Sequence, residues 1–348
     1  MSAFPVRRWL TLAAVTAAAT LLVPLVPGAA VSGAAAAPKP SPTPGSEGNT
    51  PPLLRDVIER TSRAYVEAKS AVAESQRKQL QLRLDLDKFE RRRADLIPEV
   101  AEIARHSYMT GRIGPALMLL NSADESDFLR RAQDLETKAT FDSQRLQALG
   151  DALEKVEQSK TQIDIEVKKE KAQLGVMAKQ KAEADRAFKL TGGRTTNGYV
   201  YVSSPTARQS PKGNDGGWPS QSCSEDDPTT GGCITPRLKF ALNETQRLGF
   251  KRFVSCYRSG GPFEHPKGRA CDFSAFRSGF GSGDAGGQDK FYGNNLAAFF
   301  VRNADRLGVL YVIWYRQIWL PAIGWKSYGS AFGDPSSDHT NHVHLSVL

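Results

Sequence analysis

The chain has 348 residues, enough for more than one domain, and it combines 40% hydrophobic with 24% charged residues. Its formal net charge of +9 is spread thinly, because residues 53–190 carry 26 basic and 24 acidic side chains and residues 218–348 carry 14 and 11. A nucleic-acid-binding protein concentrates positive charge on one element, so we expect no nucleic-acid partner. Weak attraction to an anionic cell wall or membrane surface fits the charge better.

Residues 1–37 have the pattern of a secretory signal peptide. An arginine pair at 7–8 precedes an apolar run over 9–26, and a stretch of small residues then offers A-x-A cleavage sites. The alternative is a membrane anchor, but Pro24 and Pro27 interrupt the run and no charged stop-transfer segment follows. We therefore expect a secreted protein that acts outside the cell or in the cell wall.

Residues 38–52 form a Pro-rich linker with too few apolar residues to pack. Residues 53–190 are then dense in Arg, Glu, Lys, Leu and Ala, which are strong helix formers. Pro98 is predicted to open a new helical segment, and the Ser122-x-x-Glu125 motif is predicted to cap the next helix. The segment 53–190 is therefore predicted to form an antiparallel coiled-coil hairpin of two long helices.

The predicted turn of the hairpin has a different composition from its arms. Glycines and a proline over 111–115 mark the turn, and the apolar run Ala116–Leu120 follows it with no charged residue. Exposed apolar patches usually mark contact sites, so the tip is predicted to bind a partner. The alternative is a hairpin that serves only as a spacer.

Residues 191–217 are predicted to be a flexible linker that contains one short strand at Tyr199–Val202. Residues 218–348 then have the size of a single domain. Their mixture of short apolar runs and two helical stretches predicts an α+β domain with a small antiparallel sheet. The predicted strands lie at 253–257, 270–274, 309–314 and 342–347. A capped helix is predicted to start within 234–242, and a second helix is predicted at 294–307.

The four cysteines all lie in this last third of the chain. An even number of cysteines in one region of an exported protein predicts two disulfides. Three connectivities exist, of which proximity favours Cys223 with Cys233 and Cys256 with Cys271. The competing interpretation, a four-cysteine zinc site, lacks any C-x-x-C pair.

Four of the five histidines lie in two short runs of the same domain, from His265 to Asp272 and from Asp338 to His344. Two neutral imidazoles and one carboxylate are the ligands of many catalytic zinc sites, which keep one position open. Residues i and i+2 of a strand point to the same face, so His342 and His344 can address one site. The alternatives are a histidine-rich tail that binds metal adventitiously and a terminal strand that the histidines only cap.

The pattern H-x-x-G-x-A-x-D followed by H-x-H is similar to that of the zinc D-alanyl-D-alanine carboxypeptidase family, whose fold is shared with lysostaphin-type peptidases and the hedgehog signalling domain. This resemblance covers residues 237–348. It implies that His265, Asp272 and His344 bind Zn²⁺ and that His342 lies beside the metal. Arg258, in the matching segment Ser-Cys-Tyr-Arg-Ser, is implied to hold the substrate.

Two features depart from that family. Phe263 stands where many relatives have serine, two residues before the first ligand. The glutamate of an E-x-x-H motif is also missing, because Asn341 occupies its position. The general base would then be His342, Asp338 or His339.

The hairpin is similar to the coiled-coil regions of secreted peptidoglycan hydrolases and of their activators in bacterial cell division. That resemblance implies that the tip docks to a membrane protein of the division complex. Together the two resemblances predict a secreted zinc peptidase that cleaves peptidoglycan peptides and is localised or regulated by its coiled coil. The alternatives are a noncatalytic component that binds cell wall or activates another hydrolase, and a domain whose metal is purely structural.

Overall fold

The computed structural model describes residues 52–111, 113–328 and 333–348. The predicted signal peptide and all of the Pro-rich linker but its last residue lie outside the described residues. The described chain consists of a long helical hairpin followed by an α+β domain that contains small antiparallel sheets. This is the fold class that the sequence predicts.

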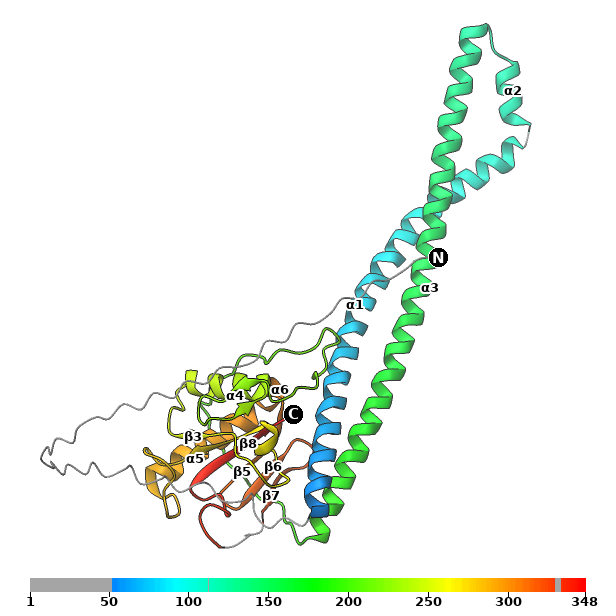
Figure 1. The fold of residues 1–348 in the computed structure, drawn as a ribbon. Helices are drawn as coiled ribbons and strands as arrows, with labels where there is room; N and C mark the ends of the chain where they lie inside the picture. The colour runs from blue at the N-terminus through cyan, green and yellow to red at the C-terminus, as the bar shows by residue number, and fades with distance from the viewer. Residues whose placement is uncertain (1–51, 112, 329–332) are drawn as a thin grey trace, which may run out of the picture. The chain divides into compact units, whose positions relative to one another are not determined.

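The hairpin is made of α1 (Pro52–Thr110), α2 (Gly114–Leu120) and α3 (Glu125–Leu190). Figure 1 shows α1 and α3 running side by side, with α2 at the end where they are joined. Small and β-branched residues are buried along this pairing, among them Val72, Ala152 and Val156. Their burial against the facing helix stabilises helices of this length more than helix propensity does.

Two predicted details of the hairpin are wrong. Pro98 lies inside α1, which continues through it, because one lost backbone hydrogen bond does not end a helix whose neighbouring Leu96 is fully buried. Helix α3 is capped by Asp124, whose side chain accepts a hydrogen bond from the backbone N–H of Asp127 at 2.8 Å, and not by Ser122. A carboxylate at this position also interacts favourably with the helix dipole.

A six-stranded sheet forms the centre of the C-terminal domain, with strand order β3-β4-β8-β5-β6-β7 and antiparallel pairing throughout. The strands β1 and β2 pair separately as a two-stranded sheet. The terminal strand β8 therefore lies in the middle of the larger sheet, between β4 and β5 (Figure 1). The strand bounds are β1 Glu225–Asp226, β2 Cys233–Ile234, β3 Val254–Ser255, β4 Ala270–Ser274, β5 Val309–Trp314, β6 Gln317–Leu320, β7 Gly324–Ser327 and β8 His342–Val347.

Three helices accompany the sheet: α4 (Pro236–Arg247), α5 (Gly287–Arg302) and α6 (Ala304–Leu307). The helix predicted over 294–307 is therefore two helices, separated at Asn303, and the first begins earlier. The short strand predicted at Tyr199–Val202 is wrong: this segment has no regular structure, and Tyr199 instead packs edge-on against the Trp325 ring. Strands β6 and β7 form a hairpin that the sequence analysis did not predict.

The larger sheet has two chemically different faces, because side chains alternate along each strand. One face, here called the back face, packs into the apolar core beneath α4, α5 and α6. The other, here called the front face, carries the histidines. The back face is formed by Cys271, Phe273, Val312, Trp314, Val343, Leu345 and Val347.

Two disulfides join Cys223 to Cys233 and Cys256 to Cys271, the connectivity that proximity favoured. All four cysteines are thus oxidised, which indicates an oxidising, extracellular type of environment. Among the described residues, no helix combines the length and the apolar character needed to cross a membrane.

Candidate metal centre

Strands β4 and β8 bring two of the predicted metal ligands together. Their antiparallel register places Asp272 directly opposite His344, on the front face. The third, His265, begins the short 3-10 helix η1 (His265–Lys267), which precedes β4. Gly268 ends η1 with φ +66°, and a Cβ at this position would collide with the Cys223 sulfur, so only glycine allows this tight entry.

The three side chains converge on one point. His265 Nε2 lies 3.2 Å from Asp272 Oδ1 and 3.3 Å from His344 Nδ1, and His344 Nδ1 lies 2.9 Å from the same carboxylate oxygen. Ligands bound to zinc at about 2.0–2.1 Å in a tetrahedron lie roughly 3.3 Å apart. The buried group His265, Asp272 and His344 therefore has the atoms and the spacing to hold a metal ion.

The atoms that face away from this point are held as well. His265 Nδ1–H donates to the Cys256 carbonyl, so its Nε2 presents a lone pair. His344 Nε2 lies 2.8 Å from Ser346 Oγ, to which Nε2–H can donate while Nδ1 presents its lone pair. Such outer contacts fix the tautomer and orientation of metal-binding histidines.

Arg258 contacts one of the metal-ligand candidates. Its Nη1 donates to Asp272 Oδ2 at 2.6 Å, and its side chain is 23% exposed. Burial alone would raise the pKa of Asp272, but His265, His342 and Arg258 outweigh it and hold that pKa well below its usual range. Asp272 is therefore ionised, as a metal ligand must be.

Two further histidines flank the group. His342 Nε2 lies 3.5 Å from Asp272 Oδ1, and its Nδ1–H donates to Asn341 Oδ1 at 2.7 Å. Burial, only partly opposed by Asp272, lowers the pKa of His342 to about 4. The His339 ring lies 4.7 Å from the His342 ring, and burial together with His342 and His344 lowers the pKa of His339 far below its usual value. Both rings are neutral at pH 7.

Asp338 does not join the group. Its Oδ2 accepts from Arg316 Nε at 2.8 Å, and the group whose ligand atoms lie close together consists of His265, Asp272 and His344. Of the candidates for the general base, the structure brings His342 closest to the carboxylate that the histidines share.

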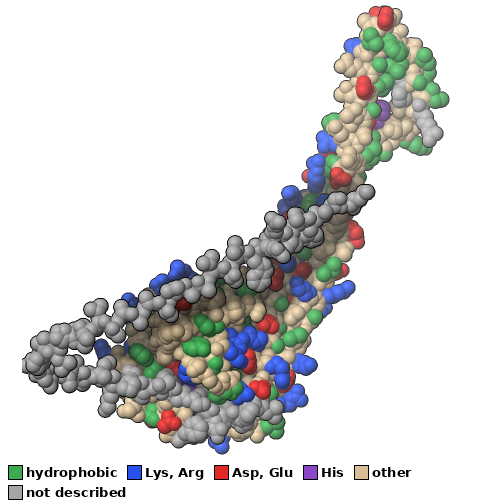
Figure 2. Space-filling view, viewed as in Figure 1, with side chains coloured by type: hydrophobic (Ala, Val, Ile, Leu, Met, Phe, Trp, Pro, Cys, Tyr) green, Lys and Arg blue, Asp and Glu red, His purple; other side chains and the backbone are tan. Residues whose placement is uncertain are grey.

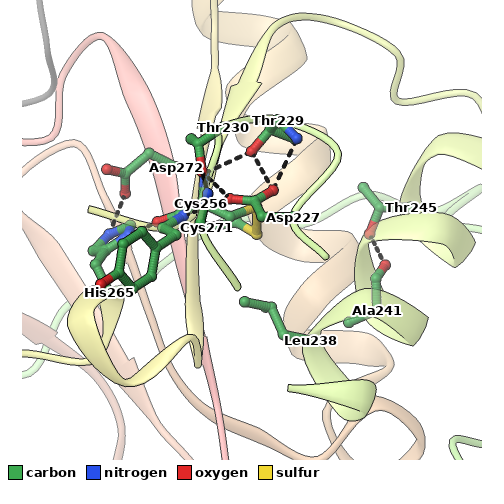
Figure 3. The surroundings of a disulfide bond; sticks show 12 residues. Asp227, Thr229, Thr230, Leu238, Ala241, Thr245, Cys256, His265, Cys271 and Asp272 are labelled. Carbon is green, nitrogen blue, oxygen red and sulfur yellow. Dashed lines mark hydrogen bonds and ion pairs between the residues drawn. A yellow bond between two sulfur atoms is a disulfide. The ribbon is translucent and has the colours of Figure 1, made fainter. Parts of the chain in front are cut away.

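The Cys256–Cys271 disulfide ties the elements of this site together (Figure 3). Cys256 supplies the carbonyl that holds His265, and Cys271 directly precedes Asp272 in β4. A loop carboxylate, Asp227, accepts from the backbone N–H of Tyr257 at 2.8 Å and so anchors the chain after Cys256. The disulfide thereby links the outer contact of one ligand to the strand that carries another.

Two residues of the site, Ser346 and Tyr311, were not predicted from the sequence. Ser346 continues the i, i+2 alternation of His342 and His344, so its placement could have been inferred from the strand pattern. Tyr311 stacks on the His344 ring at 5.4 Å with an interplanar angle of 10°. No local sequence signal indicates this contact, because it depends on the pairing of β5 with β8.

Residues 230–343 match a family model described as VldE, C-terminal domain. The match covers α4, α5, α6 and most of the large sheet, and it includes His265 and Asp272 but ends one residue before His344. Neither a curated protein nor a solved structure matches the chain.

Proposed function

We propose that this protein is a secreted, zinc-dependent hydrolase of peptidoglycan peptides, a carboxypeptidase or endopeptidase. The observation that carries the proposal is that His265 Nε2, Asp272 Oδ1 and His344 Nδ1 lie within 3.3 Å of one another. The Cys256–Cys271 disulfide holds the sheet at this site. Two imidazoles and one carboxylate, with a fourth position left over, are the donor set of hydrolytic zinc sites.

Zinc held by His265, Asp272 and His344 would supply Lewis-acid chemistry to a peptide carbonyl and to water. His342 supplies the proton acceptor, because its Nδ1–H donates to Asn341 and its neutral Nε2 faces Asp272 at 3.5 Å. Arg258 keeps Asp272 ionised and aligned. Because the Arg258 side chain is partly exposed, one edge of its guanidinium can also bind a substrate carboxylate.

The substrate class follows from compartment and resemblance. Two disulfides suit an oxidising environment, and the predicted signal peptide suits export. The H-x-x-G-x-A-x-D and H-x-H segments are similar to those of D-alanyl-D-alanine carboxypeptidases, which act on cell-wall peptides. Peptidoglycan is therefore the proposed substrate and binding partner.

The tip of the hairpin supports a second partner. Figure 2 shows hydrophobic side chains gathered at this end of the hairpin. Exposed fractions reach 90% for Tyr108, 78% for Met109 and 81% for Leu120, which is costly unless a partner covers them. A membrane protein of the division complex is the proposed occupant, on the resemblance of the hairpin to division-associated coiled coils.

Zinc content and peptide cleavage test the proposal together. Purified protein without its signal peptide is expected to hold one zinc ion per chain by elemental mass spectrometry. His265→Ala is expected to lose it, and His106→Ala, which removes the one histidine outside the site, is expected to keep it. Mass spectrometry of muropeptides is expected to detect cleavage that a chelator abolishes. A wild-type protein that binds no zinc would sink the proposal.

One observation favours the noncatalytic alternative: the glutamate of E-x-x-H is replaced by Asn341. In that case the domain binds cell wall or activates a separate hydrolase. The two functions differ in the effect of His344→Ala, which leaves full biological activity in the noncatalytic case and removes it in the catalytic one. Cell separation in a strain that carries only this variant is the measurement.

A further inference from the structure

The metal-ligand candidates on the front face are closed to solvent. His265, Asp272 and His344 have no exposed surface, and His342 is 1% exposed. A hydrolytic site must admit a peptide to the metal, so something that lies on this face has to move before a substrate enters. The described residues that lie on this face next to the ligands belong to the base of the hairpin.

Apolar side chains continue the front face beyond the ligands, in a strip made of Tyr311, Ile313, Ile318 and Leu320. The base of the hairpin covers this strip: Ile58 and Val66 of α1 and Phe188 of α3 pack into the same buried cluster. The cover is tight, because the cavity left between α1 and the strip measures about 20 Å³. That space holds about one water molecule.

The strip adjoins the metal centre directly. Tyr311 stacks on His344, and its ring also lines the small cavity under α1. Glu264, the neighbour of His265, lines the same cavity, opposite Arg55 and Glu59 of α1. The first turns of α1 therefore lie against the residues that flank the metal ligands.

Ion pairs hold this cover at its edge. Glu59 Oε2 pairs with Lys267 at 2.9 Å, and Glu59 Oε1 pairs with Arg269 at 2.9 Å. Both cations also pair with Glu264, so Glu59 adds a bond to a cluster that exists without it. Glu59 is 29% exposed and Lys267 is 39% exposed, and ion pairs with such exposure are weak enough to open.

We infer that the strip formed by Tyr311, Ile313, Ile318 and Leu320 is the groove for the peptide substrate, and that residues 55–66 of α1 occupy it as a built-in plug. An apolar groove that ends at a few convergent polar groups is the usual form of a ligand site. Helix and peptide cannot share it, so the hydrolase is active only when the base of the hairpin leaves the sheet. The substrate part of this inference rests on the function proposed above.

The release variant for the test is Ile58→Asp with Glu59→Lys, which places charge under the plug and reverses its ion pairs. The control on the same helix is Leu84→Asp with Glu102→Lys, where Leu84 is 59% exposed and Glu102 pairs only with Arg105 among the described residues. Glu59→Lys alone serves as a milder release variant if the double substitution reduces the yield of folded protein.

The first measurement is the rate at which zinc leaves the full-length mature protein for an excess of a coloured chelator. We expect the release variant to lose zinc on the order of tenfold faster than the wild type, because the open state is more populated. The control is expected to match the wild type. Equal rates in all three proteins would overturn the plug.

The second measurement does not need zinc. Diethylpyrocarbonate labelling, read by peptide mass spectrometry, reports the accessibility of His339 and His342, with the exposed His106 as internal reference. Faster labelling of His342 in the release variant, at unchanged His106 labelling, supports the plug; unchanged labelling refutes it. If no protein binds zinc but labelling still rises, the proposed zinc function fails and the plug stands.

Cleavage of muropeptides links the two proposals. We expect the zinc-loaded release variant to cleave on the order of tenfold faster than the wild type, in proportion to the open population. If both proteins bind zinc and cleave at the same rate, the plug fails while the zinc hydrolase stands.

Discussion

The two faces of the same six-stranded sheet differ in chemistry although they share every strand. On the back face Phe273, Val343 and Leu345 pack into the apolar core. On the front face their direct neighbours in the chain, Asp272 and His344, belong to the group that could hold a metal ion. In the strand His-Val-His-Leu-Ser-Val, alternate side chains therefore pack in the core or face the candidate metal site, because successive side chains point in opposite directions.

The two faces also differ in what their burial costs. Apolar side chains gain free energy when they leave water, whereas a buried carboxylate or imidazole costs free energy unless it is paired. Asp272 is compensated by Arg258, and His265 by the Cys256 carbonyl. We therefore expect substitutions on the back face to change mainly stability, and those on the front face to change mainly metal binding.

Phe273→Ala gives the largest expected effect on stability. Phe273 is 2% exposed and its ring lies 5.1 Å from that of Phe300, so the truncation leaves a cavity in the core. The free energy of unfolding is expected to fall by about 3–5 kcal/mol in chemical denaturation. The same truncation at Phe291, which is 59% exposed, is expected to change it by less than about 0.5 kcal/mol. A similar loss at both positions would contradict this account of the back face.

Ser346→Ala is expected to weaken zinc binding by about 10- to 100-fold, because it removes the partner of His344 Nε2. Competition with a chelator of known affinity measures the change. Ser346→Thr keeps the hydroxyl and is expected to restore most of the affinity. If alanine leaves the affinity unchanged, Ser346 does not position His344. Unlike the loss at Phe273, the effect on the free energy of unfolding of the metal-free protein is expected to be small.

Glu244→Gln gives the smallest expected effect and probes a helix that covers the back face. Hydrogen bonds from Arg247 and Arg208 lower the pKa of Glu244 to about 2. The folded pKa lies below the unfolded one, so the stabilisation is present above about pH 4.5 and is lost as the pH falls towards 2. Because both arginines are well exposed, we expect glutamine to cost only about 1 kcal/mol at pH 7.

Urea denaturation at several pH values checks this prediction. The difference between wild type and Glu244→Gln is expected to shrink steadily below pH 4.5 and to vanish near pH 2. Glu225→Gln, which removes an ion pair with Lys239 whose side chains are 36–40% exposed, is the control and is expected to change little at any pH. A difference that stays constant with pH would show that the carboxylate charge is not the cause. Zinc content is expected to be unchanged in both variants.

Much of this site could be predicted from local pattern. The alternation in His342–Val347 and the spacing of His265 from Asp272 predicted that these side chains share one site. The resemblance to the zinc carboxypeptidases then singled out the three residues that the structure brings together. The short hairpin of β6 and β7 was not predictable in the same way, because Gly324–Ser327 has no clear alternation and is a strand through its pairing with β6. Asp338 was predicted as a candidate general base because it lies near the histidines in sequence, but in the structure its carboxylate pairs with Arg316.

The sequence by itself determined the helical hairpin and the residue types of the candidate metal centre, and it favoured one pairing of the cysteines by proximity. These features depend on composition and on the spacing of residues that are close in sequence, which also determine where helices, turns and strands form. Only the tertiary structure decided that β8 lies between β4 and β5, that Tyr311 stacks on His344 and that the base of α1 covers the front face. Such contacts join residues far apart in the chain, as Glu59 and Arg269 are with 210 positions between them, and only packing of the whole chain selects such pairs.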